Sequence, residues 1–236
     1  MDFPRPGVLL PDRFRGRPTI DPSKCRAGCR TCADSCPTQA IGISPLHLDL
    51  GACLFCTHCE DACPEGAIAC SGDHRLATRS RADLVVGGGA LKLAQALETK
   101  VRKLLGRSLK LRQVSAGGCN GCEAELLATG NVIFDIGRWG IQFVASPRHA
   151  DGLVVTGPVT RNMEQALRET YAAMPSPKIV IAVGACAISG GPFAGAAAAL
   201  GGSLPDIPVD LFIPGCPPHP YTMMDGLLRL LGRMDG

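Results

Sequence analysis

The chain has 236 residues, of which 46% are hydrophobic and 4% aromatic, and its formal net charge is +3. This length allows one medium and one small domain, whereas so small a charge gives no reason to expect a nucleic-acid partner. The 29 glycines, 19 prolines and 13 cysteines favour loop-rich packing around cofactors over a large aliphatic enzyme core.

The first 18 residues contain no apolar signal-peptide core and no twin-arginine pair, so we expect a cytoplasmic protein with reduced thiols. In that compartment dense cysteine pairs usually bind metal rather than form disulfides. Residues 179–205 carry no charge, but their many glycines predict a buried strand followed by a loop. We therefore expect no transmembrane helix.

Residues 1–22 are rich in proline and arginine and predict an extended arm, which would be disordered without a partner. Residues 23–75 contain an internal repeat, in which Cys-Pro-x-x-Ala-Ile occurs at 36–41 and again at 63–68. Each copy follows a cysteine triplet, and a repeat this short predicts a small domain with pseudo-twofold symmetry.

Residues 76–110 predict a linker with a basic amphipathic helix, because Ala94, Leu97, Val101 and Leu104 recur at helical spacing. Such a helix either docks on an anionic membrane or a partner, or packs on its own domain with a solvated basic face. The spacing leaves both interpretations open. The basic residues concerned are Lys92, Lys100, Arg102, Lys103 and Arg107.

Residues 111–236, with a strand that straddles their start, alternate between strand-like and helix-like stretches. This alternation predicts an α/β, flavodoxin-like domain with a mostly parallel sheet. The expected strands are 109–114, 141–145, 153–156, 179–183 and 211–213, and the expected helices are 122–128, 162–173 and 221–231.

Eight cysteines in residues 23–75 form two runs that each end in Cys-Pro. The second run has the spacing of bacterial ferredoxins, in which three cysteines bind one four-iron cluster and the fourth binds the partner cluster. This predicts one cluster on Cys25, Cys29, Cys32 and Cys63, and another on Cys53, Cys56, Cys59 and Cys36. Residues 23–75 resemble the two-cluster bacterial ferredoxins, an α+β fold, over almost their whole length.

The first run has one extra residue between Cys25 and Cys29, which a loop through Gly28 can absorb. This departure makes Cys25 the least certain ligand and leaves a three-iron cluster open at that site. Zinc, which also binds four cysteines, is the alternative metal, but two interleaved runs ending in Cys-Pro disfavour it.

Four further cysteines lie in loops after predicted strands of the α/β domain. The carboxyl ends of parallel strands gather ligand-binding loops at one edge of a sheet, so cysteines far apart in sequence can converge there. The residues concerned are Cys119, Cys122, Cys186 and Cys216.

Several segments of this domain carry a family resemblance: 117–125 (GGCNGCEAE), 146–151 (SPRHAD), 157–161 (GPVTR), 184–186 (GAC) and 214–218 (PGCPP). The chain resembles the small subunit of membrane-bound energy-converting [NiFe]-hydrogenases, as in formate hydrogenlyase, which is similar in turn to the 20 kDa subunit of complex I. The resemblance covers about residues 108–232. Its Cys-x2-Cys spacing favours the hydrogenase branch over the complex I branch, where the two cysteines are adjacent.

The resemblance implies that Cys119, Cys122, Cys186 and Cys216 bind a proximal four-iron cluster that faces a large-subunit active site on another chain. It implies an electron-transfer subunit of an oxidoreductase, with three [4Fe-4S] clusters, on the cytoplasmic face of a membrane. The expected partners are a large subunit, membrane subunits, and soluble ferredoxin or formate dehydrogenase. A complex-I-like oxidoreductase without nickel and a free-standing electron carrier remain the alternatives.

A few other residues have both a functional and an ordinary structural interpretation. Glu123 and Glu125 begin a helix, where acids are favoured anyway, but they could form a proton path or a partner contact. Arg148 and His149 follow a strand and could donate hydrogen bonds near the proximal cluster, or simply be solvated. Cys70 completes no motif and is expected to be a small buried hydrophobic residue.

Overall fold

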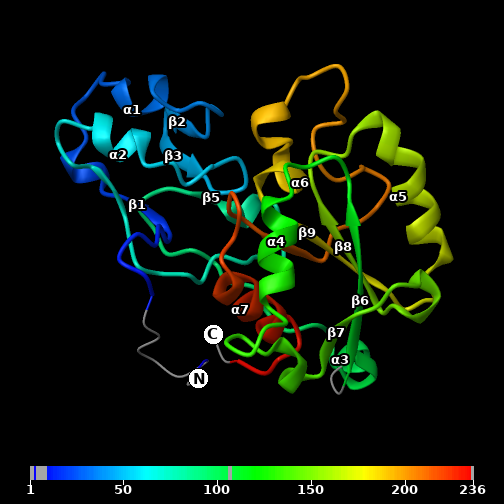
Figure 1. Cartoon of the computed structure of the whole chain (residues 1–236). Helices are drawn as coiled ribbons and strands as arrows, with labels where there is room; N and C mark the ends of the chain where they lie inside the picture. The colour runs from blue at the N-terminus through cyan, green and yellow to red at the C-terminus, as the bar shows by residue number, and fades with distance from the viewer. Residues whose placement is uncertain (1–2, 4–9, 106–107, 235–236) are drawn as a thin grey trace.

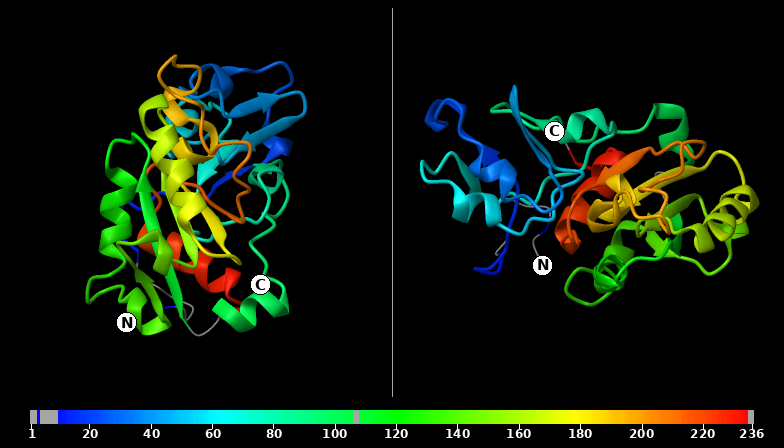
Figure 2. Two further views of the ribbon diagram at one scale, coloured as in Figure 1. Left: turned by 90° about the vertical axis from the view of Figure 1, so that its right-hand side faces the viewer. Right: turned by 90° about the horizontal axis from the view of Figure 1, so that it is seen from above.

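The computed structural model describes residues 3, 10–105 and 108–234, and it places a small domain beside a larger α/β domain (Figures 1 and 2). The α/β domain is built on a five-stranded parallel sheet with the order β10-β9-β8-β6-β7. Its strands are β6 (Leu109–Ser115), β7 (Ile141–Phe143), β8 (Gly152–Thr156), β9 (Ile179–Val183) and β10 (Leu211–Ile213).

The predicted parallel α/β fold is confirmed, and β9 and β10 have the predicted bounds. The helices are α4 (Gly121–Ala128), α5 (Arg161–Ala173), α6 (Ala185–Ser189) and α7 (Pro220–Leu230). No helix in the described ranges combines the length and the apolar character that crossing a bilayer requires.

The central strands are apolar on both faces because each face packs against helices. Leu153 and Val180 lie in a buried cluster with Leu167 of α5. The neighbouring strand residues Val154 and Ile181 point the other way, into a cluster that includes the methionines and leucines of α7. This alternation explains why these strands read as continuous hydrophobic runs in the sequence.

The small domain contains two short antiparallel sheets and two short helices, α1 (Thr31–Asp34) and α2 (His58–Ala62). One sheet holds β2 (Ile41–Ile43), β3 (Leu46–Asp49) and β5 (Val85–Val86), and the other pairs β1 (Pro18–Ile20) with β4 (Ile68–Cys70). The repeat is visible in this arrangement, because β2 and β4 begin at equivalent isoleucines of the two Cys-Pro-x-x-Ala-Ile copies.

Two expectations for the linking segments were wrong. The described part of the arm is ordered, because β1 finds its pairing partner β4 on the same chain and Ile20 is buried there. The helix expected from Ala94 begins only at Thr99, as α3 (Thr99–Leu105). The backbone N–H groups of Ala94 and Leu97 are instead bonded to the carbonyls of Ala77 and Leu230, so this stretch packs extended across α7.

The basic residues of the linker are partly accounted for by its own domain. Lys92 forms an ion pair with Asp83, a residue of the same linker, at 3.3 Å. This contact agrees with packing on the same chain, the second of the two interpretations. Arg107 and the side chains of Lys100 and Leu104 lie outside the described residues.

The two domains share a hydrophobic core. Leu48 and Leu50 of the small domain belong to the same buried cluster as Ile188 of α6 and Phe212 of β10. Thr78 forms two backbone hydrogen bonds with Phe212, of 3.0 and 2.9 Å, which tie the linker to the edge strand of the sheet. The position of the small domain is therefore fixed by buried apolar contacts rather than by a flexible tether.

A buried ion pair inside α7 generates a test of this packing. Arg229 donates from Nε to Asp225 at 2.9 Å, with side chains only 4% and 0% exposed. We expect Arg229→Met to lower the free energy of unfolding by about 3–5 kcal/mol, because it leaves a buried carboxylate without its cation. Urea denaturation of the purified protein measures this effect.

The matched control is the double variant Asp225→Leu/Arg229→Met, which removes both charges and retains apolar volume. It should be less destabilised than the single variant, since no uncompensated charge remains buried. A double variant that is as unstable as Arg229→Met or less stable would contradict the explanation.

Candidate metal centres

The first group of cysteines lies around α1. It consists of Cys25, Cys29 and Cys32 from the first run and Cys63 from the second run. Burial raises the pKa of the Cys32 thiol, and repulsion from Cys63 and Cys25 raises it further. Cys29 lies between Cys25 and Cys32 in the chain. Its Sγ lies 3.4 Å from the hydroxyl of Thr31, and this hydrogen bond lowers the pKa of Cys29. The structure thus brings Cys63 to the cysteines of the first run.

The extra residue between Cys25 and Cys29 is accommodated as the sequence suggests. Gly28 has φ of +76°, and no atom lies near the position of a Cβ, so the loop turns there without strain. Cys25 remains close enough to Cys32 for the two thiols to repel. The longer spacing does not remove Cys25 from the group.

The second group consists of Cys36, Cys53, Cys56 and Cys59, which line one enclosed cavity. Burial raises the pKa of Cys53 to about 12 and that of Cys59 to about 11, and the neighbouring thiols add to both shifts. Cys36 comes from the first run and the other three from the second. The two runs are therefore interleaved in space as their spacing predicted.

Backbone amides donate to the sulfurs of both groups. The N–H groups of Ala40 and Ala67 lie 3.2 and 3.3 Å from the Sγ atoms of Cys36 and Cys63, at equivalent positions of the repeat. Phe55 N–H donates in the same way to Cys53 at 3.3 Å. Such donors stabilise negative charge on sulfur, and the thiolate is the form that binds metal.

The third group lies at the carboxyl edge of the parallel sheet. Cys119 and Cys122 follow β6, Cys186 follows β9 and Cys216 follows β10. Burial raises the pKa of Cys122 to about 12, and Glu123 and the other three thiols raise it further. Burial likewise raises the pKa of Cys186 to about 11. The convergence expected from the strand order is present.

One glycine makes this convergence possible. Gly184 has φ of +90°, and a Cβ at this position would lie 2.4 Å from the Sγ of Cys122. Real side chains do not tolerate so close an approach, and L-residues rarely adopt this φ. The turn after β9 can therefore pass directly beside Cys122 only because position 184 has no side chain.

The donor set in all three groups is suited to iron and sulfide. Among the described side chains, no three His, Cys, Asp or Glu residues converge closely enough to hold a single metal ion. Four thiolates around one zinc would lie about 4 Å apart, whereas a four-iron cluster holds its cysteines at the corners of a larger group. Burial and mutual repulsion disfavour ionisation of the thiols, and coordination to metal cations offsets both.

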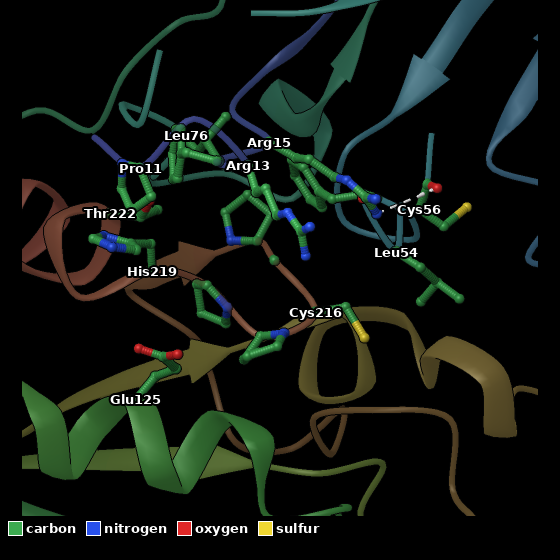
Figure 3. A pocket seen from close by; sticks show the side chains of 16 residues that line it. Pro11, Arg13, Arg15, Leu54, Cys56, Leu76, Glu125, Cys216, His219 and Thr222 are labelled. Carbon is green, nitrogen blue, oxygen red and sulfur yellow. Dashed lines mark hydrogen bonds between the residues drawn. The ribbon is translucent and has the colours of Figure 1, made fainter. Parts of the chain in front are cut away.

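The second and third groups face a common cavity of 590 Å³ between the domains. Cys56 and Cys216 both line it, together with Glu125, His219 and residues of the N-terminal arm (Figure 3). Burial raises the pKa of Cys216, and the Cys119 and Cys56 thiols contribute. The Cys56 loop of the small domain thus lies close to Cys216 of the sheet-edge group.

The two predicted glutamates have different surroundings. Glu123 is buried and accepts hydrogen bonds from Thr156 Oγ1 at 2.6 Å and Ser115 Oγ at 2.7 Å. Burial raises its pKa, but these hydrogen bonds outweigh burial and hold the pKa below its usual value. Glu125 is half-buried beside the cavity, where burial raises its pKa. Glu123 therefore anchors α4 to the sheet, and Glu125 lies beside the cavity.

Arg148 and His149 are not brought to the cysteines. They are exposed in a turn that precedes β8, at the amino ends of the strands. The cysteine loops follow the carboxyl ends, and five residues of β8 separate the two edges by about 16 Å. Arg148 and His149 suggested a role because they follow the strand expected at 141–145. That strand, β7, pairs its last residue Phe143 with Leu111, so β7 ends level with the start of β8 and away from the cysteine loops.

Sequence reasoning missed two residues beside the second group. Cys70 ends β4, lines the same cavity as Cys53 and Cys59, and has its pKa raised to about 12 by burial and by the neighbouring Glu60. Arg15, from the arm, lies close to the carbonyls of Phe55 and Cys56. No sequence pattern predicts the position of either residue. Cys70 ends β4 and Arg15 precedes β1, so the pairing of β1 with β4 places both beside the second group.

Three groups of four cysteines, held by a ferredoxin-like domain and a parallel-sheet domain, define an iron–sulfur protein. The family profile "NADH ubiquinone oxidoreductase, 20 Kd subunit" matches residues 119–230, and a "4Fe-4S binding domain" profile matches residues 17–41. The chain belongs to this family of 20 kDa oxidoreductase subunits, which confirms the resemblance seen in its motifs.

Relatives in the family include subunits of hydrogenase complexes. Formate hydrogenlyase subunit 7 of Escherichia coli is 43% identical over 59% of this chain, and the match spans 54% of that relative's length. The probable membrane-bound hydrogenase subunit mbhJ of Pyrococcus furiosus is 42% identical over 56% of this chain and 79% of its own. A chain of the archaeal membrane-bound sulfane sulfur reductase matches with a TM-score of 0.50 and 34% identity, covering 58% of this chain and 75% of that one.

The close approach at Gly184 generates a prediction for the sheet-edge group. We expect Gly184→Ala to push Cys122 away and to lower the iron content of anaerobically purified protein, because the new Cβ would overlap its sulfur. Gly195→Ala is the matched control, since Gly195 also has positive φ but has no atom within 4 Å of the Cβ position. Equal iron loss in the two variants would show that backbone strain alone, and not the contact with Cys122, causes the defect.

Proposed function

We propose that this chain is the electron-transfer subunit of a membrane-associated, hydrogenase-like oxidoreductase complex and that it holds three [4Fe-4S] clusters in series. The observation that carries the proposal is the serial placement of the three cysteine groups. The first two are interleaved within one small domain, and the second and third face one cavity at Cys56 and Cys216. Bound clusters of this type accept and donate single electrons.

The proposed ligands follow the grouping of the thiols, and each set has four members. The first set takes Cys63 from the second run, and the second set takes Cys36 from the first run. Thiol chemistry, amide donors to sulfur and the fixed contact between the domains all support these sets. The sets are Cys25, Cys29, Cys32 and Cys63; Cys53, Cys56, Cys59 and Cys36; and Cys119, Cys122, Cys186 and Cys216.

We further propose that the active site of the complex lies on a large subunit that covers the third group. Cys119 and Cys216 are exposed at the surface of this chain. After Cys119 in the chain, α4 and the loop that follows it expose Leu127, Val132 and Ile133, which are 77%, 96% and 56% accessible. Exposed apolar side chains of this size are typical of a protein interface.

The printed names of the relatives support a membrane complex as the setting. They include a membrane-bound hydrogenase subunit and a respiratory membrane complex. We propose that the chain lies peripherally on the cytoplasmic face, with membrane subunits as neighbours and soluble ferredoxin or formate dehydrogenase as the electron partner. A free-standing carrier would have no reason to expose the apolar residues of α4 and the loop after it.

The second candidate is the same electron-transfer role in a complex-I-like oxidoreductase that lacks nickel, which the family description itself favours. The large subunit distinguishes the two candidates. Two Cys-x2-Cys pairs in that subunit would supply the thiolates of a nickel site. A large subunit without them would favour the complex-I-like function with a quinone or another acceptor.

The cluster count is tested by iron and sulfide analysis of anaerobically purified protein. We expect about twelve irons and about twelve acid-labile sulfides per chain, because three four-iron clusters contain these numbers. About eleven irons, with the signal of a three-iron cluster, would place the shortfall at the Cys25 site. About eight irons, or zinc in place of iron, would contradict the proposal.

The assignment of the third group is tested by Cys216→Ala. This change should remove one cluster, about four irons, and leave the two clusters of the small domain, because their ligands come from a separate set of cysteines. Electron paramagnetic resonance of the reduced protein would follow the loss of one signal. Cys70→Ala is the control, since it removes a thiol that belongs to none of the three sets.

A further inference from the structure

The N-terminal arm brings a positive charge to the junction between the second and third cysteine groups. Arg15 Nη1 lies 3.4 Å from the carbonyl oxygen of Cys56 and 3.5 Å from that of Phe55 (Figure 3). Both distances are long for hydrogen bonds, but a full charge acts over this range. In the part of the chain that the structure describes, no carboxylate forms an ion pair with Arg15.

The arm is held on both sides of this point, which fixes the backbone position of Arg15. Phe14 packs edge-on against His219 of the α/β domain, with ring centroids 5.3 Å apart. On the other side, Gly16 N–H donates to Ser71 O at 2.9 Å, and Arg17 N–H donates to Asp73 O at 2.9 Å. Arg15 therefore lies between two anchored neighbours, one for each domain.

The position of Arg15 coincides with the route between the two groups. Arg15, Cys56 and Cys216 line the same cavity, and the Arg15 guanidinium lies at the backbone of Cys56. Cys56, one of the proposed ligands of the second group, thus lies beside an exposed cation that forms no ion pair among the described residues. A cluster gains negative charge when it is reduced, so a cation at this distance stabilises its reduced form.

We propose that Arg15 is a redox-tuning residue, which raises the reduction potential of the cluster on Cys36, Cys53, Cys56 and Cys59 relative to its neighbours. This inference rests on the proposed function. It adds to that function the residue that sets the difference in reduction potential between the clusters on the two sides of the domain junction. The arm, which binds no cluster itself, then acts as a structural part of the electron path.

The test is a redox titration of the full-length, iron-loaded protein, monitored by electron paramagnetic resonance. Arg15→Gln should shift the midpoint potential of one cluster downward and leave the other two unchanged. At the midpoint potential of the unmodified protein, the ratio of reduced to oxidised second cluster should fall several-fold. Arg15→Lys, which keeps the charge, should shift the potential less than Arg15→Gln.

Arg13→Gln is the matched control, because Arg13 lines the same cavity but makes no hydrogen bond to the Cys56 loop among the described residues. Unchanged potentials in iron-loaded Arg15→Gln, or an equal shift in Arg13→Gln, would overturn the proposal. If Arg15→Gln loses iron, the downward shift must appear in iron-loaded Arg15→Ala, which also removes the charge, and its absence there overturns the proposal too. Failure of the proposed function would look different, since the unmodified protein itself would lack three clusters.

Discussion

The packing of twelve thiols into three groups, each with at least one buried member, is the constraint on which the rest of this structure depends. Burial and the neighbouring thiols raise the pKa of Cys53 and Cys122 to about 12, which disfavours their thiolate forms, and metal cations between the sulfurs would offset this cost. Metal binding and the packing of the cysteine loops are therefore thermodynamically linked. Loops rich in glycine and proline, rather than long helices, surround the groups because the backbone must approach the sulfurs closely.

The same requirement explains why the two domains form one unit. The proposed electron transfer requires a fixed spacing between the cysteine groups, and a core shared by the two domains fixes it. Leu50 of the small domain packs in one cluster with Ile188 and Phe212 of the sheet domain, close to the loops that carry Cys186 and Cys216. The N-terminal arm crosses the outside of the same junction and contacts both domains through Phe14 and Arg15.

Much of this organisation could be predicted from local sequence patterns. Cysteine spacing identified the interleaved pair, because three-residue steps and a following proline are imposed by the cluster geometry itself. The strands of the sheet were predicted because residues such as Val180 and Ile181 are buried on both faces and so form unbroken apolar runs. The linker helix was misjudged at its start, because Ala94 and Leu97 have helical spacing but donate their N–H groups to Ala77 and Leu230.

The sequence by itself determined which cysteines belong to which domain, the parallel order of strand and helix, and the family of the chain, since these depend on spacing and periodicity along the backbone. Only the tertiary structure decided that Cys56 and Cys216 face one cavity, that Arg15 lies at the Cys56 carbonyl, and that Arg148 and His149 lie at the far edge of the sheet. Such relations depend on strand register and on the docking of two domains. Both arise from contacts between residues far apart in the chain, which local patterns do not encode.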